Sequence, residues 1–367
     1  MKMNRSAVMF EYRLVASFDE VRKKLLSKEF ADRLDKPLAY WALPSDRSSP
    51  IALLGRTLRD LLATPFDELY ATAGIGQKKI RSLVELLQRA ARPHPPGGAP
   101  NDVPTSAEVT NASNGGGIDP SLVSEALWVE WRASVQTHDL GKETMGRCAR
   151  SLQDLPRVIW NTPLDAYTGL SLQAIRSLKT HGEKRVRAVL EVFGSMHAIV
   201  GRMNTPSHLA VRILPHFVAQ VEERIHALCR QTTPVTLEQI RRHFVDPLMA
   251  QVRIDLGDQI ARLAESRLAL DGSGATVRQV ARRLNLTRAR VYQLLNDVGA
   301  IMLVRWPEAP ALVRQLRERL EADDRDSRAM KLFNDTAELF FADKRRETEV
   351  EPATNERTKA EREPQLA

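Results

Sequence analysis

Residues 276–298 read TVRQVARRLNLTRARVYQLLNDV, and the apolar spacing of this stretch predicts a helix-turn-helix. Apolar residues recur three and four positions apart in two separate runs, which are Val277, Val280, Ala281 and Leu284, and then Val291, Leu294, Leu295 and Val298. Asn285 lies between the runs, where a tight turn requires a left-handed backbone that Asn tolerates better than most residues. Thr287 stands at the expected N-cap of the second helix, because its hydroxyl can accept a backbone N–H of the next turn.

The charge of this stretch suits a partner that carries phosphates. One acid, Asp297, is set against five arginines, which are Arg278, Arg282, Arg283, Arg288 and Arg290. We expect Arg278, Arg282 and Arg283 to neutralise backbone phosphates. Residues near the start of a recognition helix reach base edges in the major groove, and the residues expected there are Thr287, Arg288, Arg290, Tyr292 and Gln293. The alternative is a helix pair of a larger bundle whose arginines are merely solvated.

The same stretch resembles the promoter-reading fourth region of bacterial sigma factors. The residues that carry the resemblance are Thr276, Val277, Val280, Ala281, Arg282, Arg283, Leu284, Leu286, Thr287, Arg288, Arg290, Val291 and Gln293. The resemblance implies that the second helix lies in the major groove of the upstream promoter element, with Arg288, Arg290 and Gln293 facing DNA. That family usually has Glu at the position of Ala289 and a basic residue at the position of Tyr292, so its DNA sequence preference does not transfer.

Residues 51–92 are expected to form a helical module around a Gly-x-Gly hairpin at residues 74–76. Gly74 and Gly76 let the backbone turn tightly and come close to a nucleic-acid backbone. The free N–H groups at the start of the following helix suit a phosphate, and Lys78 and Lys79 add positive charge nearby. This helix-hairpin-helix resembles the C-terminal domain of the bacterial RNA polymerase alpha subunit.

A second copy of the module is predicted at about residues 164–195. GQKKIRSLVELL at 76–87 aligns without a gap with GEKRVRAVLEVF at 182–193, and at the same offset Leu58 falls on Leu164. The second hairpin keeps a single glycine, Gly182, so its candidate phosphate contacts are Gly182, Lys184 and Arg185. For both hairpins the alternative is a protein-docking or purely core-forming role.

The composition limits the classes of protein to consider. The formal charge of +8 over 367 residues favours an anionic partner, although both signs of charge are abundant. Two cysteines, Cys148 and Cys229, argue against a disulfide framework or a cysteine-based zinc site. No hydrophobic run approaches membrane-spanning length and no secretory signal is evident, so we expect a cytoplasmic protein.

We predict an all-α, multidomain chain with helix-hairpin-helix modules and a helix-turn-helix domain. The expected divisions are an N-terminal segment of unknown function at 1–50, a hairpin module at 51–92, a disordered linker at 93–120, a second related module at 121–200, a helical region with the helix-turn-helix at 201–342, and a disordered charged tail at 343–367. The linker and the tail are poor in large apolar residues, which is typical of segments that cannot bury enough surface to fold.

The predicted function is duplex DNA binding in transcription initiation or regulation. RNA polymerase is a natural partner if alpha-like and sigma-like modules lie in one chain. The alternatives are a protein-interaction scaffold and a protein that binds DNA without sequence preference in repair or defence. We identify no catalytic grouping, cofactor motif, metal-ligand spacing or small-molecule site, and therefore predict a protein that is not an enzyme.

Overall fold

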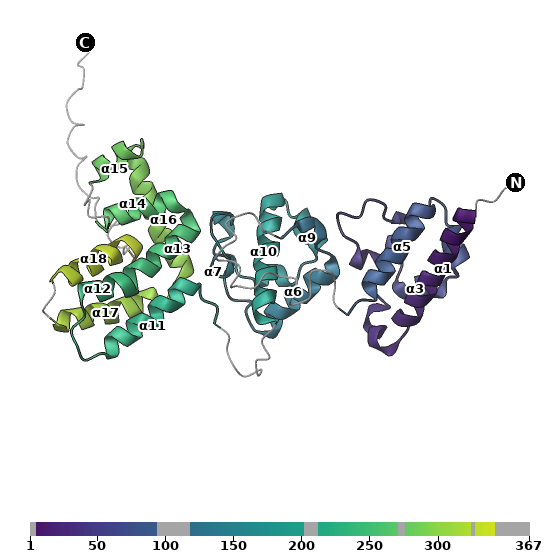
Figure 1. Ribbon diagram of the computed structural model, residues 1–367, viewed down its shortest axis with the longest axis horizontal. Coiled ribbons are helices and arrows are strands. Elements are labelled where there is room, and N and C mark those ends of the chain that lie inside the picture. Colours follow the sequence, from purple (N-terminus) through teal and green to yellow (C-terminus); the bar gives the residue numbers. More distant parts are fainter. Residues whose placement is uncertain (1–4, 94–117, 202–211, 271–275, 324–326, 342–367) are drawn as a thin grey trace, which may run out of the picture. The chain divides into compact units, whose positions relative to one another are not determined.

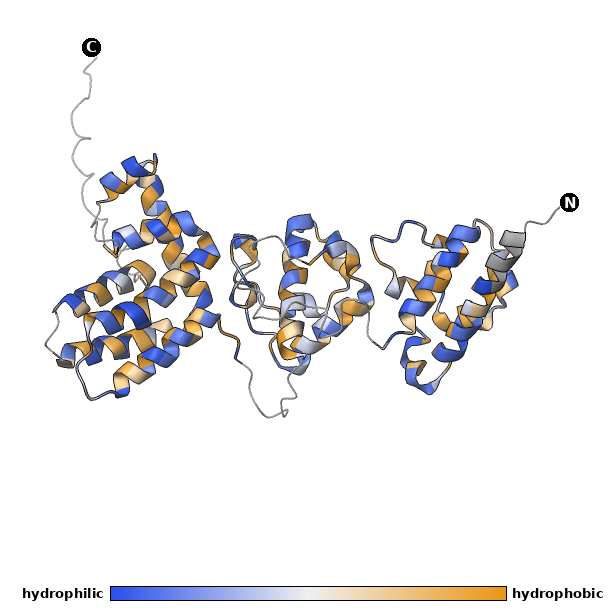
Figure 2. Ribbon diagram, viewed as in Figure 1, coloured by the Kyte–Doolittle hydropathy of each residue, from blue (hydrophilic) through white to orange (hydrophobic). Residues whose placement is uncertain are grey.

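The computed structural model describes residues 5–93, 118–201, 212–270, 276–323 and 327–341. All regular elements in these ranges are helices, and only two isolated β-bridges occur beside them, so the all-α prediction is confirmed. Most helices have one hydrophilic and one hydrophobic side (Figure 2), as expected for helices that bury one face. The chain divides into two units, Met1–Ile213 and Leu214–Ala367.

The first part of the N-terminal unit packs around one hydrophobic core (Figure 1). Its elements are α1 (Arg5–Leu25), the 3-10 turns η1 (Lys28–Arg33) and η2 (Leu38–Trp41), α2 (Ile51–Leu54), α3 (Leu58–Ala63), α4 (Phe66–Tyr70) and α5 (Gln77–Ala90). Phe18 and Leu25 of α1 lie in the same core as Leu61 of α3 and Leu83 of α5. The division that we expected at residue 50 therefore falls inside a continuous core.

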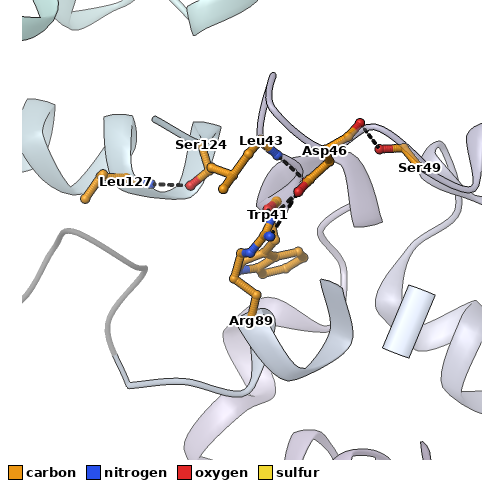
Figure 3. A network of polar contacts seen from close by, with 7 residues as sticks. All are labelled: Trp41, Leu43, Asp46, Ser49, Arg89, Ser124 and Leu127. Atoms are coloured by element: carbon orange, nitrogen blue, oxygen red, sulfur yellow. Dashed lines mark hydrogen bonds and ion pairs between the residues drawn. The ribbon is translucent and has the colours of Figure 1, made fainter. Parts of the chain in front are cut away.

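A partly buried ion pair joins two distant segments of this core (Figure 3). Arg89, in the last turn of α5, donates to both carboxylate oxygens of Asp46 at 2.9 and 3.1 Å and to the carbonyl of Trp41 at 2.7 Å. Asp46 also accepts the backbone N–H of Leu43 at 2.7 Å. Burial acts to raise the pKa of Asp46, but the bonds from Arg89 and Leu43 outweigh it and hold the pKa below its usual range.

The second part of the N-terminal unit ends with helices that match those at the end of the first part. Its elements are η3 (Pro120–Leu122), α6 (Glu125–Thr137), α7 (Met145–Cys148), η4 (Arg157–Ile159), α8 (Asp165–Thr168), α9 (Leu172–Ser177) and α10 (Glu183–Val200). The α9–hairpin–α10 segment corresponds to α4–hairpin–α5, and Leu58 and Leu164 are both fully buried, as are Leu69 and Ile175.

The backbone carries a further sign of this repeat. An isolated antiparallel bridge joins Pro37 to Thr57 in the first copy and Thr144 to Pro163 in the second. The flanking hydrogen bonds also correspond, because Leu58 N–H donates to the Lys36 carbonyl at 3.0 Å, whereas Leu164 N–H donates to the Glu143 carbonyl at 2.9 Å. The internal likeness thus extends upstream of the two hairpins that the sequence comparison aligned.

The regular elements of the C-terminal unit are also helices. They are α11 (His216–Arg230), α12 (Leu237–Ile240), the π-helical turn η5 (Arg241–Val245), α13 (Asp246–Leu256), α14 (Asp258–Arg267), α15 (Val277–Arg283), α16 (Arg288–Arg305), α17 (Ala309–Asp323) and α18 (Ser327–Phe341). Gly257, at φ +86°, separates α13 from α14, because glycine adopts this backbone conformation without steric cost.

Two expectations fall largely on residues outside the described ranges. Residues 94–117, which make up most of the predicted linker, and the predicted tail at 343–367 are not among the residues that the structure describes. Within the described ranges, no helix is both long enough and apolar enough to cross a bilayer.

Candidate nucleic-acid interface

The turn between α15 and α16 has the local geometry that its residues predict. Asn285 adopts a left-handed backbone at φ +53°. The Thr287 hydroxyl accepts the backbone N–H of Arg290 at 3.1 Å and so caps α16. A second cap, which our sequence reasoning did not identify, starts α15: Thr276 and Gln279 each accept a backbone N–H of the other in a capping box. The signal was present as a Thr followed three residues later by Gln.

The inner faces of α15 and α16 pack against α14. Val280 and Ala281 of α15 share a hydrophobic core with Leu263 of α14 and with Val291 and Leu295 of α16. The helix-turn-helix is therefore the outer part of a three-helix arrangement whose first helix is α14 (Figure 1). This packing uses the side of α16 that carries its apolar residues and leaves the other side open.

All eight residues predicted to contact DNA are exposed. They are Arg278, Arg282, Arg283, Thr287, Arg288, Arg290, Tyr292 and Gln293. Tyr292 is 56% exposed, which is high for a large aromatic side chain. The Arg290 guanidinium donates to Gln293 Oε1 at 3.3 Å, one turn further along α16. The first two turns of α16 thus present a polar face to solvent.

Three of these arginines meet around a shallow depression. Arg278 and Arg282 of α15 and Arg288 of α16 line a volume of about 450 Å³, together with Ala281, Asn285 and Leu286. Arg278, Arg282 and Arg288 form no ion pair with a described carboxylate. Their charges therefore remain available to an anion at the concave side of the turn.

The far end of α16 is fixed inside the C-terminal unit. Arg305 is 1% exposed and forms a bidentate ion pair with Asp255 of α13, which is fully buried. Arg305 Nε lies 2.9 Å from Asp255 Oδ2, and the Gln251 side-chain amide donates to the same oxygen at 2.7 Å. Next to it, the indole N–H of Trp306 donates to Glu222 of α11 at 2.7 Å. One helix therefore carries the exposed polar face at its start and a buried polar anchor at its end.

The first hairpin has the tight backbone turn that its glycines predict. Gly74 has φ +79°, so this turn does require glycine. Lys78 and Gly76 are exposed, and no side chain caps the start of α5. Lys79, however, donates to the Gly74 carbonyl at 2.8 Å and thereby holds the hairpin itself. Lys78 is the better placed of the two lysines for an external phosphate.

The second hairpin differs in its conformation. None of its described residues has positive φ, and Tyr167 Oη lies 3.0 Å from His181 Nε2. Burial, followed by the charge of Arg185, lowers the pKa of His181. Gly182 and Lys184 are exposed and Arg185 is half-buried. Both hairpins belong to the N-terminal unit, whereas the helix-turn-helix belongs to the C-terminal unit.

Within the described ranges, no group of three or more His, Cys, Asp or Glu side chains is arranged to hold a metal ion.

Comparison with protein-family models, with curated proteins and with solved structures finds no match to this chain.

Proposed function

We propose that the chain binds duplex DNA through α15 and α16 and acts in transcription initiation or regulation. The observation that carries this proposal is the division of α16, whose first two turns expose a polar face while its last turns are anchored in the protein. A helix held in this way can enter a major groove, which admits an α-helix, without unfolding.

The arginines divide into two roles. Arg278 and Arg282, at the depression beside the turn, suit backbone phosphates, which position a protein without reading sequence. Arg288, Arg290 and Gln293 suit base edges, because Arg bonds guanine and Gln bonds adenine in the major groove. A bidentate base contact of this kind contributes about 1–3 kcal/mol of discrimination against a wrong base.

RNA polymerase is the protein partner that we propose. The support is the likeness of residues 276–298 to the fourth region of sigma factors and of the two hairpin modules to the alpha-subunit domain. In this arrangement the hairpins contribute phosphate contacts that do not depend on sequence, chiefly through Lys78. Affinity purification of the tagged full chain, with mapping of the bound DNA from the same sample, tests the partner: recovery of polymerase subunits and promoter DNA is expected, and their absence would exclude this role.

Fluorescence anisotropy with duplexes selected from a random pool tests the DNA-reading face. We expect the double variant Arg288→Ala/Arg290→Ala to lose the preference for the selected sequence over random duplex. Arg314→Ala serves as the matched control, because Arg314 is an exposed arginine on α17 with no described ion-pair partner. Unchanged preference in the double variant would remove α16 as the reading helix, and no binding to any duplex would favour an interaction protein.

A further inference from the structure

A second cluster of basic side chains lies on the C-terminal unit away from the helix-turn-helix. Arg224 and Gln220 of α11 and Arg242, His243 and Pro247 of the η5–α13 segment line a depression of about 320 Å³. Figure 1 shows α11 and α15 at opposite ends of this unit. Helix α11 packs against both η5 and α13, so the two walls of the depression are held together by the core.

The π-helical turn accounts for the way in which these residues face one depression. The Asp246 N–H donates to the Arg241 carbonyl, five residues earlier, instead of closing an ordinary α-helical turn. Pro247 has no N–H to offer the His243 carbonyl four residues earlier, which disfavours a regular helix here. Phe244 and Val245 stay buried while Arg242 is exposed. Wide turns of this kind are frequent at functional sites.

The charges around the depression are not balanced. Arg224 and Arg242 have no carboxylate partner among the described residues. The neighbouring Arg241 differs, because its Nε lies 4.0 Å from Asp246 Oδ1. Two unpaired guanidinium groups on different elements are thus directed to the same place, and each guanidinium can donate two parallel hydrogen bonds to one phosphate.

His243 and Gln220 complete the polar lining. Burial lowers the pKa of His243, and the charges of Arg224 and Arg242 lower it further. The imidazole is therefore neutral at neutral pH and offers one N–H donor. The Gln220 side-chain nitrogen lies 2.8 Å from His216 Nε2, which holds this amide in place on α11.

We propose that α11 and η5 form a phosphate-binding site. In this site Arg224 and Arg242 donate hydrogen bonds to the phosphate oxygens, and His243 and Gln220 donate further hydrogen bonds to the same phosphate. The phosphate has two possible sources, the backbone of a bound nucleic acid or a free phosphorylated small molecule. The site does not rest on the proposed DNA-reading role of α16, because it uses none of the residues of that helix.

Histidine-selective NMR of the full chain tests the site. The chain has eight histidines, and His243→Gln assigns the signal of interest. Inorganic phosphate and pyrophosphate are titrated at constant ionic strength against sodium chloride. We expect a saturable shift of the His243 signal, with at least fivefold weaker binding in Arg224→Gln and in Arg242→Gln. Arg241→Gln is the matched control and should bind as the unmodified chain does.

Two results would overturn the proposal. One is the absence of a saturable His243 shift with either probe, and the other is an equal loss in Arg241→Gln, which would indicate a general effect of positive charge. Circular dichroism of each variant establishes that it folds. Arg288→Ala/Arg290→Ala should leave the phosphate titration unchanged, so failure of the DNA-reading role and failure of this site are told apart.

The source of the phosphate is decided by DNA binding measured over a range of salt concentrations. If the site takes a backbone phosphate, the double variant Arg224→Gln/Arg242→Gln reduces the magnitude of the negative slope of log affinity against log salt by about 0.9, the value for one phosphate. If the slope is unchanged while pyrophosphate binding is lost, the ligand is a free phosphorylated molecule. Both results support the site.

Discussion

The buried pair of Arg305 and Asp255 makes a quantitative prediction about the C-terminal unit. Arg305→Met removes the positive charge and leaves the Asp255 carboxylate in a fully buried position, where Gln251 still donates to it. Breaking a buried ion pair by removing one partner costs about 3–5 kcal/mol. That is a loss of about two to nearly four powers of ten in the ratio of folded to unfolded protein.

The measurement must report on this unit alone, because unfolding of a chain with two units does not follow a single transition. Trp306 is the one tryptophan of the C-terminal unit, since the other four, Trp41, Trp128, Trp131 and Trp160, lie in the N-terminal unit. Incorporation of 5-fluorotryptophan and fluorine NMR in urea therefore follows the transition of each unit separately. In Arg305→Met, the transition reported by Trp306 should have its midpoint at a lower urea concentration, whereas the transitions reported by the other four tryptophans should be unchanged.

Two further variants determine whether the buried charge is the cause. Asp255→Leu in the Arg305→Met background should recover much of the loss, because apolar replacement of a whole buried pair is often neutral or stabilising. Arg253 lies on α13, the helix of Asp255, and its half-exposed side chain forms ion pairs with Asp258 and Glu265. Arg253→Met removes these pairs and should lower the free energy of unfolding by at most about 1 kcal/mol. The reasoning is refuted if Arg305→Met destabilises the Trp306 transition no more than Arg253→Met does.

Three smaller predictions concern the turns and the N-terminal core. Asn285→Val should destabilise the Trp306 transition by about 1–2 kcal/mol, the cost of a left-handed backbone, whereas Asn285→Gly should cost less; equal losses would contradict this account. Thr287→Ala should lower the same transition by about 1 kcal/mol through loss of the cap, whereas Thr287→Ser should retain it. The pKa of Asp46 is lowered in the fold, so its contribution to stability is present above its unfolded pKa near 4 and is lost as the pH falls through its folded pKa. Urea titrations of the N-terminal unit from pH 6 to pH 2 should therefore show a loss of stability in acid that is smaller in Asp46→Asn than in the unmodified chain. An equal loss in the two proteins would exclude Asp46 as a source.

Local sequence patterns predicted the helices α15 and α16 and the turn between them, because the residues that decide this turn lie within a few positions of each other. The left-handed Asn285, the cap by Thr287 and the burial of Val291 and Leu295 each follow from short-range spacing. The exposure of Arg288 follows from the same helical periodicity. The DNA contacts of these residues stay predictions.

Other features could not be predicted from local patterns. The pair of Arg305 with Asp255 joins residues on different helices, and no short-range spacing signals such a contact. The joint core of α1 with α5 was missed for the same reason, because it brings together residues that are distant in sequence. The π-helical turn at η5 follows in part from Pro247, but the depression that it lines depends on α11, which is distant in sequence.

The continuity of α16 constrains how its sequence can change. Successive residues of an α-helix are rotated by about 100° around its axis, since 3.6 residues complete a turn. One inserted or deleted residue between Val298 and Arg305 would therefore swing Arg288 and Gln293 away from their present direction while the anchor stayed in place. Substitutions at the exposed start leave this direction intact. Related chains should therefore conserve the number of residues between the exposed start of this helix and the anchor, even where the side chains at its start differ.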